Sequence, residues 1–292
     1  MDPTGEIREF LTSRRARLTP ADAGLPDFGG RRRVPGLRRE EVALLAGMSV
    51  EYYVRLERGN ASGISEGILD GISRALQLDP AEHAHLHDLV RAANQGARAP
   101  RRRPATRTQQ IGPGTQRLLD AMTTVPAIVQ NGRMDLVATN LLGRALFTEM
   151  LREPSGPVNF ARFLFLDPRG RTAYRDWNDS AEQIVALLRA ASGRSPWDAG
   201  LRDLIEELTD RSSEFRELWG AHDVRVHLAG VKLFHHPEVG DLDLFYEAMQ
   251  LAADPGLQFI AFTAEPDSPS DDALRLLGSL SVRAAQTSNG EG

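Results

Sequence analysis

The fold is decided first by residues 39–59, which read REEVALLAGMSVEYYVRLERG. Two short helices can cross closely when the first has a small residue at the crossing, the turn tolerates a positive φ, and apolar side chains point inward from both. Ala43 is the small residue and Gly47 is the turn. The inward positions are Val42, Ala46, Met48, Tyr53 and Leu56. The stretch therefore predicts a helix-turn-helix.

The second helix of this motif has an outward face that suits DNA. Ser49 is the expected N-cap, and a helix N-terminus also suits a phosphate. The major groove admits one α-helix, where Arg55 could pair with a guanine edge and Glu51 could accept from a cytosine amino group. Glu57, beside many arginines, is expected to form an internal ion pair instead. The predicted outward positions are Val50, Glu51, Tyr52 and Arg55.

Charge is divided unevenly along the chain. The 292 residues include 40 Asp and Glu and 35 Lys and Arg, which gives a formal net charge of -5. Residues 1–110 hold 18 Arg and 14 acids, whereas residues 111–292 hold 17 basic and 26 acidic side chains. Such asymmetry predicts that the first part meets a polyanion, although a solvated arginine face on a plain helical hairpin is the alternative. The expected phosphate contacts are Arg31, Arg32, Arg33, Arg38 and Arg39.

Composition and periodicity divide the chain into four parts. About five helices predict an all-α domain at residues 1–95, and residues 96–114 form a basic linker rich in Pro, Gly and Arg. An α+β domain follows at residues 115–282, and residues 283–292 are expected to be a disordered tail.

The second domain is expected to contain an antiparallel sheet. Apolar runs on either side of Asn131-Gly132 suggest a β-hairpin, and three later runs read as strands. Helical spacing lies between them, at residues 181–191 and 201–208. This order indicates an antiparallel α+β domain rather than a doubly wound one. The three later runs are residues 231–234, 242–246 and 259–262.

Several function classes lack support in the sequence. With no Cys, the chain has neither a disulfide nor a thiolate metal site. It lacks the nucleotide-binding, zinc-protease, calcium-loop and hydrolase motifs, so we expect no enzyme and no cofactor. No apolar run is long enough to cross a membrane and the N-terminus lacks a signal pattern, which predicts a cytoplasmic protein.

The N-terminal 95 residues resemble the XRE-type helix-turn-helix regulators. The run GLPDFGGRRRVPGLRREEVALLAGMSVEYYVRLERG, residues 24–59, is similar to the subgroup that carries an MmyB-like ligand-binding domain. The second half is similar to that domain across NFARFLFLDPRGR, RDWNDSAEQIVALLRAASGR, SSEFRELWGAHDVR, HHPEVGDLDLFYEAM and FTAEPDSPS, so the resemblance extends from Gly5 to about Leu277. It implies a DNA-binding transcriptional regulator whose C-terminal domain has a PAS-like fold and binds a small, largely apolar molecule such as a fatty acid.

The sequence departs from this family at two places. Ile64-Ser65 stands where the family usually has Pro-Ser, and the serine cap is kept. Thr139 stands before Asn140 where the family often has an aromatic residue, which would enlarge or polarise a ligand cavity.

Candidate ligand contacts are the aromatic side chains and convergent polar groups of the second domain. Taken singly, each aromatic side chain is expected in the core rather than at a ligand, although some of the set must border a cavity if one exists. The candidates are Asn140, Phe163, Phe165, Arg175, Trp177, Trp219, His222, Phe234, Phe245 and Tyr246.

Two groups of histidines are candidates for metal or acid–base sites. His83 and His87 share a helix face, but no third ligand of suitable spacing is evident, and His85 points away. A second group is His222, Asp223, His227, His235, His236 and Glu238, most of which the family resemblance explains as a fold motif. We therefore assign no metal site and no catalytic residue.

These observations predict a sequence-specific transcriptional regulator, more specifically a repressor. It would bind a pseudo-palindromic operator as a homodimer and respond to a small apolar molecule. The alternatives are a small-molecule enzyme or carrier that uses the C-terminal domain, and a protein-binding adaptor.

Overall fold

The computed structural model describes residues 3–26, 36–95, 110–152, 156–221 and 229–290. They belong to two compact units, which are treated separately below. The helical unit consists of residues 1–105, 189–203 and 217–226, and the sheet unit consists of residues 106–188, 204–216 and 227–292. The sequence predicts a place in the C-terminal domain for residues 189–203 and 217–221, because their helical pattern shows no boundary there, whereas in the structure they cluster with the helical unit.

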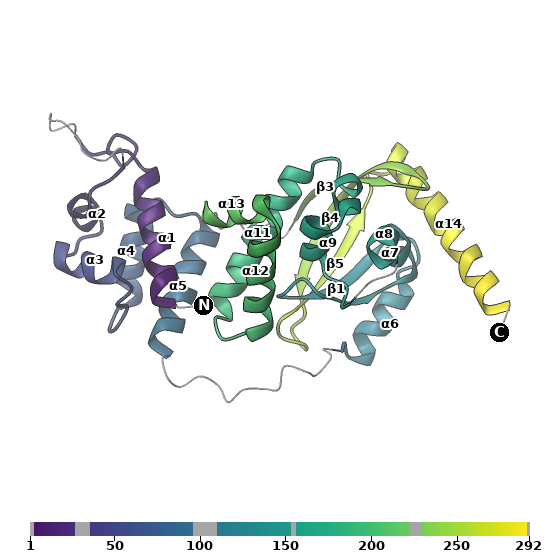
Figure 1. Ribbon diagram of the computed structural model, residues 1–292, viewed down its shortest axis with the longest axis horizontal. Helices are drawn as coiled ribbons and strands as arrows, with labels where there is room; N and C mark the ends of the chain where they lie inside the picture. Colours follow the sequence, from purple (N-terminus) through teal and green to yellow (C-terminus); the bar gives the residue numbers. More distant parts are fainter. Residues whose placement is uncertain (1–2, 27–35, 96–109, 153–155, 222–228, 291–292) are drawn as a thin grey trace. The chain divides into compact units, whose positions relative to one another are not determined.

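The helical unit begins with the predicted all-α domain (Figure 1). Its helices form where an apolar stripe repeats with helical spacing, and Phe10, Tyr53, Ile72 and Leu89 are among the residues buried in one shared core. The helices are α1 (Pro3–Arg17), α2 (Arg39–Leu45), α3 (Val50–Glu57), α4 (Glu66–Ala75) and α5 (Pro80–Gln95).

The predicted helix-turn-helix is present in α2 and α3. Gly47 has φ of +68°, a conformation that side-chain-bearing residues rarely adopt, and it forms the predicted turn. The next helix packs closely on this turn, because a Cβ atom on Gly71 would lie 2.9 Å from the carbonyl oxygen of Ala46. The inward set is confirmed, since Val42, Ala43, Tyr53 and Leu56 are buried while Ala46 and Met48 pack against them.

The sheet unit has α+β architecture, as predicted. Its strands are β1 (Ala127–Asn131), β2 (Leu136–Thr139), β3 (Ala229–His236), β4 (Gly240–Gln250) and β5 (Leu257–Thr263). The helices that follow the linker, some of which extend into the helical unit, are α6 (Pro113–Ala121), α7 (Leu141–Leu146), α8 (Thr148–Leu151), α9 (Phe160–Leu166), α10 (Pro168–Ala173), α11 (Trp177–Arg194), α12 (Ala199–Arg211), α13 (Ser213–Gly220) and α14 (Pro269–Gly290).

All five strands join one antiparallel sheet in the order β2-β1-β5-β4-β3. The β1–β2 hairpin and the three later strands are those expected from the sequence. Successive side chains of a strand point to opposite faces, so the sheet has two lined surfaces. One surface packs on Leu119 of α6 through Ala127, Val129 and Phe259.

The C-terminal end of the last helix differs from the sequence prediction. The sequence predicts a disordered tail at residues 283–292, whereas α14 continues to Gly290, because Arg283, Ala284 and Ala285 favour helix and extend it.

Among the described residues, no helix combines the length and apolarity needed to cross a membrane.

Candidate DNA-recognition helix and ligand cavity

The candidate recognition helix, α3, starts at a side-chain cap. The Ser49 hydroxyl oxygen accepts a hydrogen bond from the backbone N–H of Tyr52 at 3.2 Å. This bond satisfies one of the first-turn N–H groups, which have no partner within the helix. The other first-turn N–H groups and the positive end of the helix dipole favour an anion, so the start of α3 suits a DNA phosphate.

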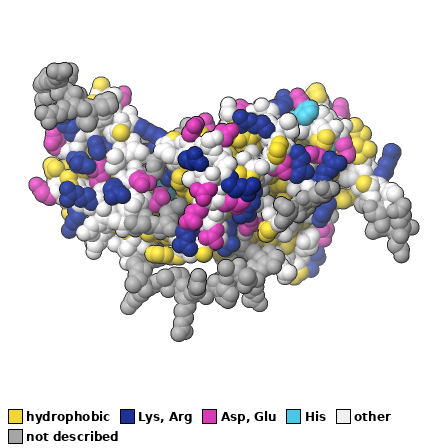
Figure 2. All heavy atoms as spheres, in the orientation of Figure 1, with side chains coloured by type: hydrophobic (Ala, Val, Ile, Leu, Met, Phe, Trp, Pro, Cys, Tyr) yellow, Lys and Arg dark blue, Asp and Glu magenta, His cyan; other side chains and the backbone are white. Residues whose placement is uncertain are grey.

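The outward side of α3 carries the residues expected to read bases. Val50 is 38% exposed, and Glu51 and Arg55 are also exposed. The guanidinium carbon of Arg55 lies 4.6 Å from the centre of the Tyr52 ring, so the ring supports the arginine from below. Figure 2 shows dark-blue basic side chains on the surface over α2 and α3, mixed with magenta acidic ones.

A buried carboxylate fixes the other side of α3. Glu57 is only 2% exposed, and it accepts from Nε of Arg15 at 2.7 Å and from Nε of Arg39. The predicted internal ion pair of Glu57 is confirmed. Arg39, expected to contact phosphate, therefore also ties α2 to α3, while 54% of its side chain stays exposed.

Of the other arginines expected to contact phosphate, Arg38 belongs to the described residues. Arg38 is 45% exposed and precedes α2, where its backbone N–H donates to the Glu41 carboxylate at 2.7 Å. Arg31, Arg32 and Arg33 lie outside the described residues.

The sheet unit contains a largely apolar cavity on the second surface of its sheet. Its empty volume is about 680 Å³, part of which is open to solvent. The strands contribute alternate residues, such as Gln258, Ile260 and Phe262 of β5, because side chains of one face recur at every second position. The register places Tyr246 beside Phe262 and Ala248 beside Ile260. The full lining is Ile128, Gln130, Met134, Phe147, Phe160, Tyr174, Ser180, Gln183, Ile184, Leu187, Lys232, Phe234, Tyr246, Ala248, Gln258, Ile260 and Phe262.

Lys232 supplies a cationic group in this lining. It is the only lysine of the chain, and its Nζ lies 3.3 Å from the Ser180 hydroxyl oxygen of α11. Burial lowers the pKa of Lys232 to about 8, although the carboxylates of Asp179 and Asp176 oppose the shift. The amine therefore remains mostly charged at neutral pH, in surroundings where an anion would be a favourable partner.

Neutral polar groups complete the cavity. Gln130 and Gln258 lie opposite each other on β1 and β5, with the Gln130 amide donating to the Gln258 oxygen at 3.5 Å. The Tyr246 hydroxyl donates to the Gln183 side-chain oxygen at 3.5 Å, and burial raises the pKa of Tyr246 to about 12. These groups can orient a ligand by hydrogen bonds without adding charge.

Of the predicted ligand residues that the structure describes, Phe234 and Tyr246 line this cavity. Asn140 is buried as the N-cap of α7, where its side chain binds the backbone of Met122, Val125, Ala127 and Gly143. The Asn140 side chain therefore joins the segment before β1 to the first turn of α7. Phe163 lines two neighbouring hollows instead.

The remaining predicted residues lie elsewhere. Phe165 packs edge-on against Trp177, whose indole N–H donates to the Leu164 carbonyl oxygen at 3.1 Å. Arg175 pairs with Asp241 and Asp243. Phe245, 47% exposed, alternates with Leu244 and Tyr246 and so lies on the opposite face of the sheet. Trp219 stacks with Arg189 in the helical unit, and His222 lies outside the described residues.

Sequence reasoning missed Lys232, Gln130 and Gln258 as cavity residues. The available signal was a polar side chain at an alternate position of an otherwise apolar strand, together with the single lysine of the chain. Aromatic content alone favoured residues that pack in the core.

The described members of the second histidine group have separate structural roles. His235 pairs with Asp241 at 2.7 Å. Buried His236 has Nε2 3.0 Å from the Ala145 carbonyl oxygen, and its Nδ1 accepts from the Glu238 N–H at 3.2 Å. His222, Asp223 and His227 lie outside the described residues.

Comparison with known families gives two matches. Residues 111–277 match the MmyB-like transcription regulator ligand binding domain, and residues 6–86 match a helix-turn-helix domain. No curated protein matches the chain.

Proposed function

The chain belongs to the family of the MmyB-like transcription regulator ligand binding domain, and from this premise we propose that it is a repressor controlled by a small apolar acid. A helix-turn-helix joined to a ligand-binding domain is the arrangement of a transcription regulator that responds to a ligand. The repressor role, the operator and the ligand class are our proposals.

The DNA-binding role is supported by the exposed side of α3. Arg55 is held over the Tyr52 ring and forms no ion pair with a carboxylate among the described residues, whereas Arg39 is engaged by buried Glu57. A guanidinium positioned in this way matches the O6 and N7 acceptors of guanine. We infer that Arg55 reads a base pair and that Arg38 and Arg39 contact the backbone, together with Arg31, Arg32 and Arg33.

DNA binding is tested by fluorescence anisotropy of the full chain with the DNA upstream of its own gene. The expected result is tighter binding to one segment than to its shuffled sequence, and a steep fall of affinity as salt rises. A flat salt dependence, or equal affinity for the shuffled DNA, contradicts the proposal and favours a protein-binding adaptor.

The ligand class is supported by the position of Lys232. An apolar cavity with one amine at its wall suits a molecule with an apolar body and one acidic group, as in a fatty acid. The neighbouring Ser180 hydroxyl can donate a second hydrogen bond to the same acid. Catalysis is not required by this arrangement.

The ligand proposal is tested by native mass spectrometry of the full chain with saturated fatty acids and with fatty alcohols of the same chain length. The acids are expected to bind more tightly, and Lys232→Met should remove this preference. Bound acid should be recovered chemically unchanged. Equal binding of acid and alcohol contradicts the role of Lys232, and a converted product would favour the enzyme alternative.

Regulation requires that ligand and operator affect each other. A single recognition helix contacts one half-site, so we propose that a homodimer binds a pseudo-palindrome and that the ligand changes the placement of the two recognition helices. A protein with this partner would act in the cytoplasm. Adding the fatty acid should change operator affinity, and unchanged affinity at saturating acid contradicts the proposal.

A further inference from the structure

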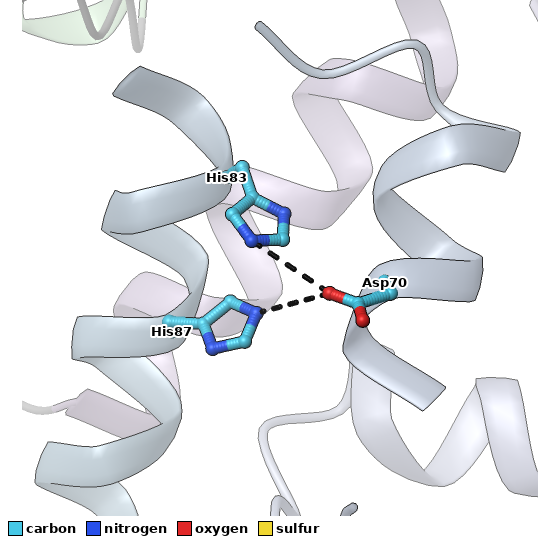
Figure 3. Close-up of side chains that lie close together, drawn as sticks. All are labelled: Asp70, His83 and His87. Carbon is cyan, nitrogen blue, oxygen red and sulfur yellow. Dashed lines mark ion pairs between the residues drawn. The ribbon is translucent and has the colours of Figure 1, made fainter. Parts of the chain in front are cut away.

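Two helices of the helical unit bring three metal-ligating side chains together (Figure 3). Asp70 lies on α4, while His83 and His87 lie one turn apart on α5. One candidate ligand atom from each residue lies within 4.8 Å of the others. Neither the outward face of α3 nor the ligand cavity uses any of these side chains.

The start of α5 sets the direction of the two imidazoles. Asp79 and Glu82 form a reciprocal cap, in which each backbone N–H donates to the other residue's carboxylate, at 3.0 and 2.8 Å. The helix therefore begins at Pro80, and His83 and His87 lie four residues apart on the side that faces α4. Their ring centres are 4.4 Å apart.

Both imidazoles direct Nε2 at the same carboxylate oxygen. The distance to Oδ1 of Asp70 is 3.7 Å from His83 and 3.8 Å from His87. Both are longer than a hydrogen bond. Ligands bound tetrahedrally to zinc at about 2.0–2.1 Å lie about 3.3 Å apart. A closure of roughly 0.5 Å, within reach of rotation of these partly exposed side chains, would therefore form a site.

The neighbouring contacts leave these nitrogens available for a metal. Ser73 Oγ lies 2.9 Å from Nδ1 of His83, and when Nδ1 carries the proton it donates to Ser73 and leaves a lone pair on Nε2. Nε2 of His87 is buried and has no hydrogen-bond partner among the described residues.

We propose that Asp70, His83 and His87 bind one divalent transition-metal ion, with zinc as the preferred ion and water completing the coordination. Two imidazoles and one carboxylate suit zinc, cobalt or nickel, whereas magnesium and calcium prefer oxygen ligands. The spacing of the histidines does not reveal this site, because Asp70 lies on a different helix from His83 and His87.

The metal would clamp α4 to α5. Asp70 precedes Gly71, the residue that lies against the turn between α2 and α3, so the clamp would stabilise the helix that supports the recognition motif. An ion that binds the folded chain alone raises its stability in proportion to the logarithm of its concentration.

The site is tested by titrating tag-free full chain with Zn²⁺ in a calorimeter and by thermal unfolding with and without Zn²⁺. The wild-type chain should bind one tight equivalent, reject Mg²⁺, and unfold at a higher temperature with Zn²⁺. Ser73→Ala should weaken binding by about 10–100-fold, as expected for a partner behind a metal ligand. His83→Ala and His87→Ala should weaken it more.

His235→Ala is the matched control, because His235 is an exposed histidine paired with one aspartate in the sheet unit. It should leave the tight equivalent unchanged. Asp70→Asn keeps the shape of the third ligand, and Co²⁺ absorption then checks the coordination of each folded variant. The proposal is overturned if the wild-type chain binds no tight Zn²⁺, or if the tight equivalent survives loss of both His83 and His87.

Discussion

In α3 the outward residues from Val50 to Arg55 fall within two turns of one helix. The cavity lining, in contrast, extends from Ile128 to Phe262 and comes from β1, β3, β4 and β5, from the helices α9 and α11, and from the segments between them. The recognition surface is therefore a local property, supported from below by Tyr53 and Leu56. The cavity exists only when distant segments pair in register. Substitutions on the outward face of α3 can separate binding from folding, but most cavity substitutions affect both.

Removal of the buried carboxylate of α3 should have the largest effect. Glu57→Ala leaves the guanidinium groups of Arg15 and Arg39 without their shared partner, at a position that is 2% exposed. We expect the helical unit to lose about 3–5 kcal/mol of unfolding free energy, measured by urea denaturation. Glu51→Ala, at an exposed position of the same helix, should stay within about 0.5 kcal/mol. Equal losses would mean that α3 is not anchored through Glu57.

Replacement of the outward arginine should separate specificity from folding. Arg55→Ala should cost about 1–3 kcal/mol at one base pair of the operator, measured by anisotropy with single-base variants. Arg38→Ala should weaken binding to all of these sequences alike and reduce the salt dependence. If Arg55→Ala also weakens all sequences equally, then Arg55 contacts the DNA backbone.

The cavity lysine should make stability depend on pH. The pKa of Lys232 is about 8 in the folded chain and has its ordinary value of 10.5 when unfolded, so the unfolded chain binds more protons between these values. The cost of the buried charge is fully present below pH 8, and the free energy of unfolding should rise as pH increases towards 10.5.

The measurement is urea denaturation of the wild-type chain and Lys232→Met across this pH range. The free energy of unfolding of the wild-type chain should rise relative to that of Lys232→Met as pH increases from 8 towards 10.5. A difference that is constant with pH would show that Lys232 titrates normally.

The smallest effect is expected on the opposite face of the sheet. Phe245→Ala removes a ring that is 47% exposed, so its unfolding free energy should change by only about 0.5 kcal/mol and fatty-acid binding should be unchanged. Denaturation and native mass spectrometry check the two readouts. Lost fatty-acid binding would place Phe245 at the ligand after all.

The helical unit was predictable because its signals are short in sequence. The glycine turn, the Ser49 cap and the apolar spacing of residues 39–59 agree with one another, and each rests on contacts within a few residues. The strands were also predictable from their apolar runs. Among the described candidates, only Phe234 and Tyr246 lie in the cavity, because the lining depends on which strands are neighbours.

The roles of Asn140 and Asp70 differ from the sequence predictions for the same reason, because both depend on contacts with residues that are distant along the chain. Asn140 looked like a ligand group but is used for capping, through backbone partners up to 18 residues away. Asp70 meets His83 and His87 only because α4 and α5 pack together, so histidine spacing alone could not reveal it. The exception is the tail, where the local preference of Ala284 and Ala285 for helix was underestimated.

The alternation of side chains in β5 has a consequence for how this regulator can diverge. Gln258 and Ile260 face the cavity, while Phe259 between them packs on Leu119. Point changes at the first two positions can retune ligand preference and leave the other face intact. A one-residue insertion in β5 would exchange the two sets at once. New ligand specificities in related genes should therefore arise by replacement within these strands, with changes of length confined to the loops.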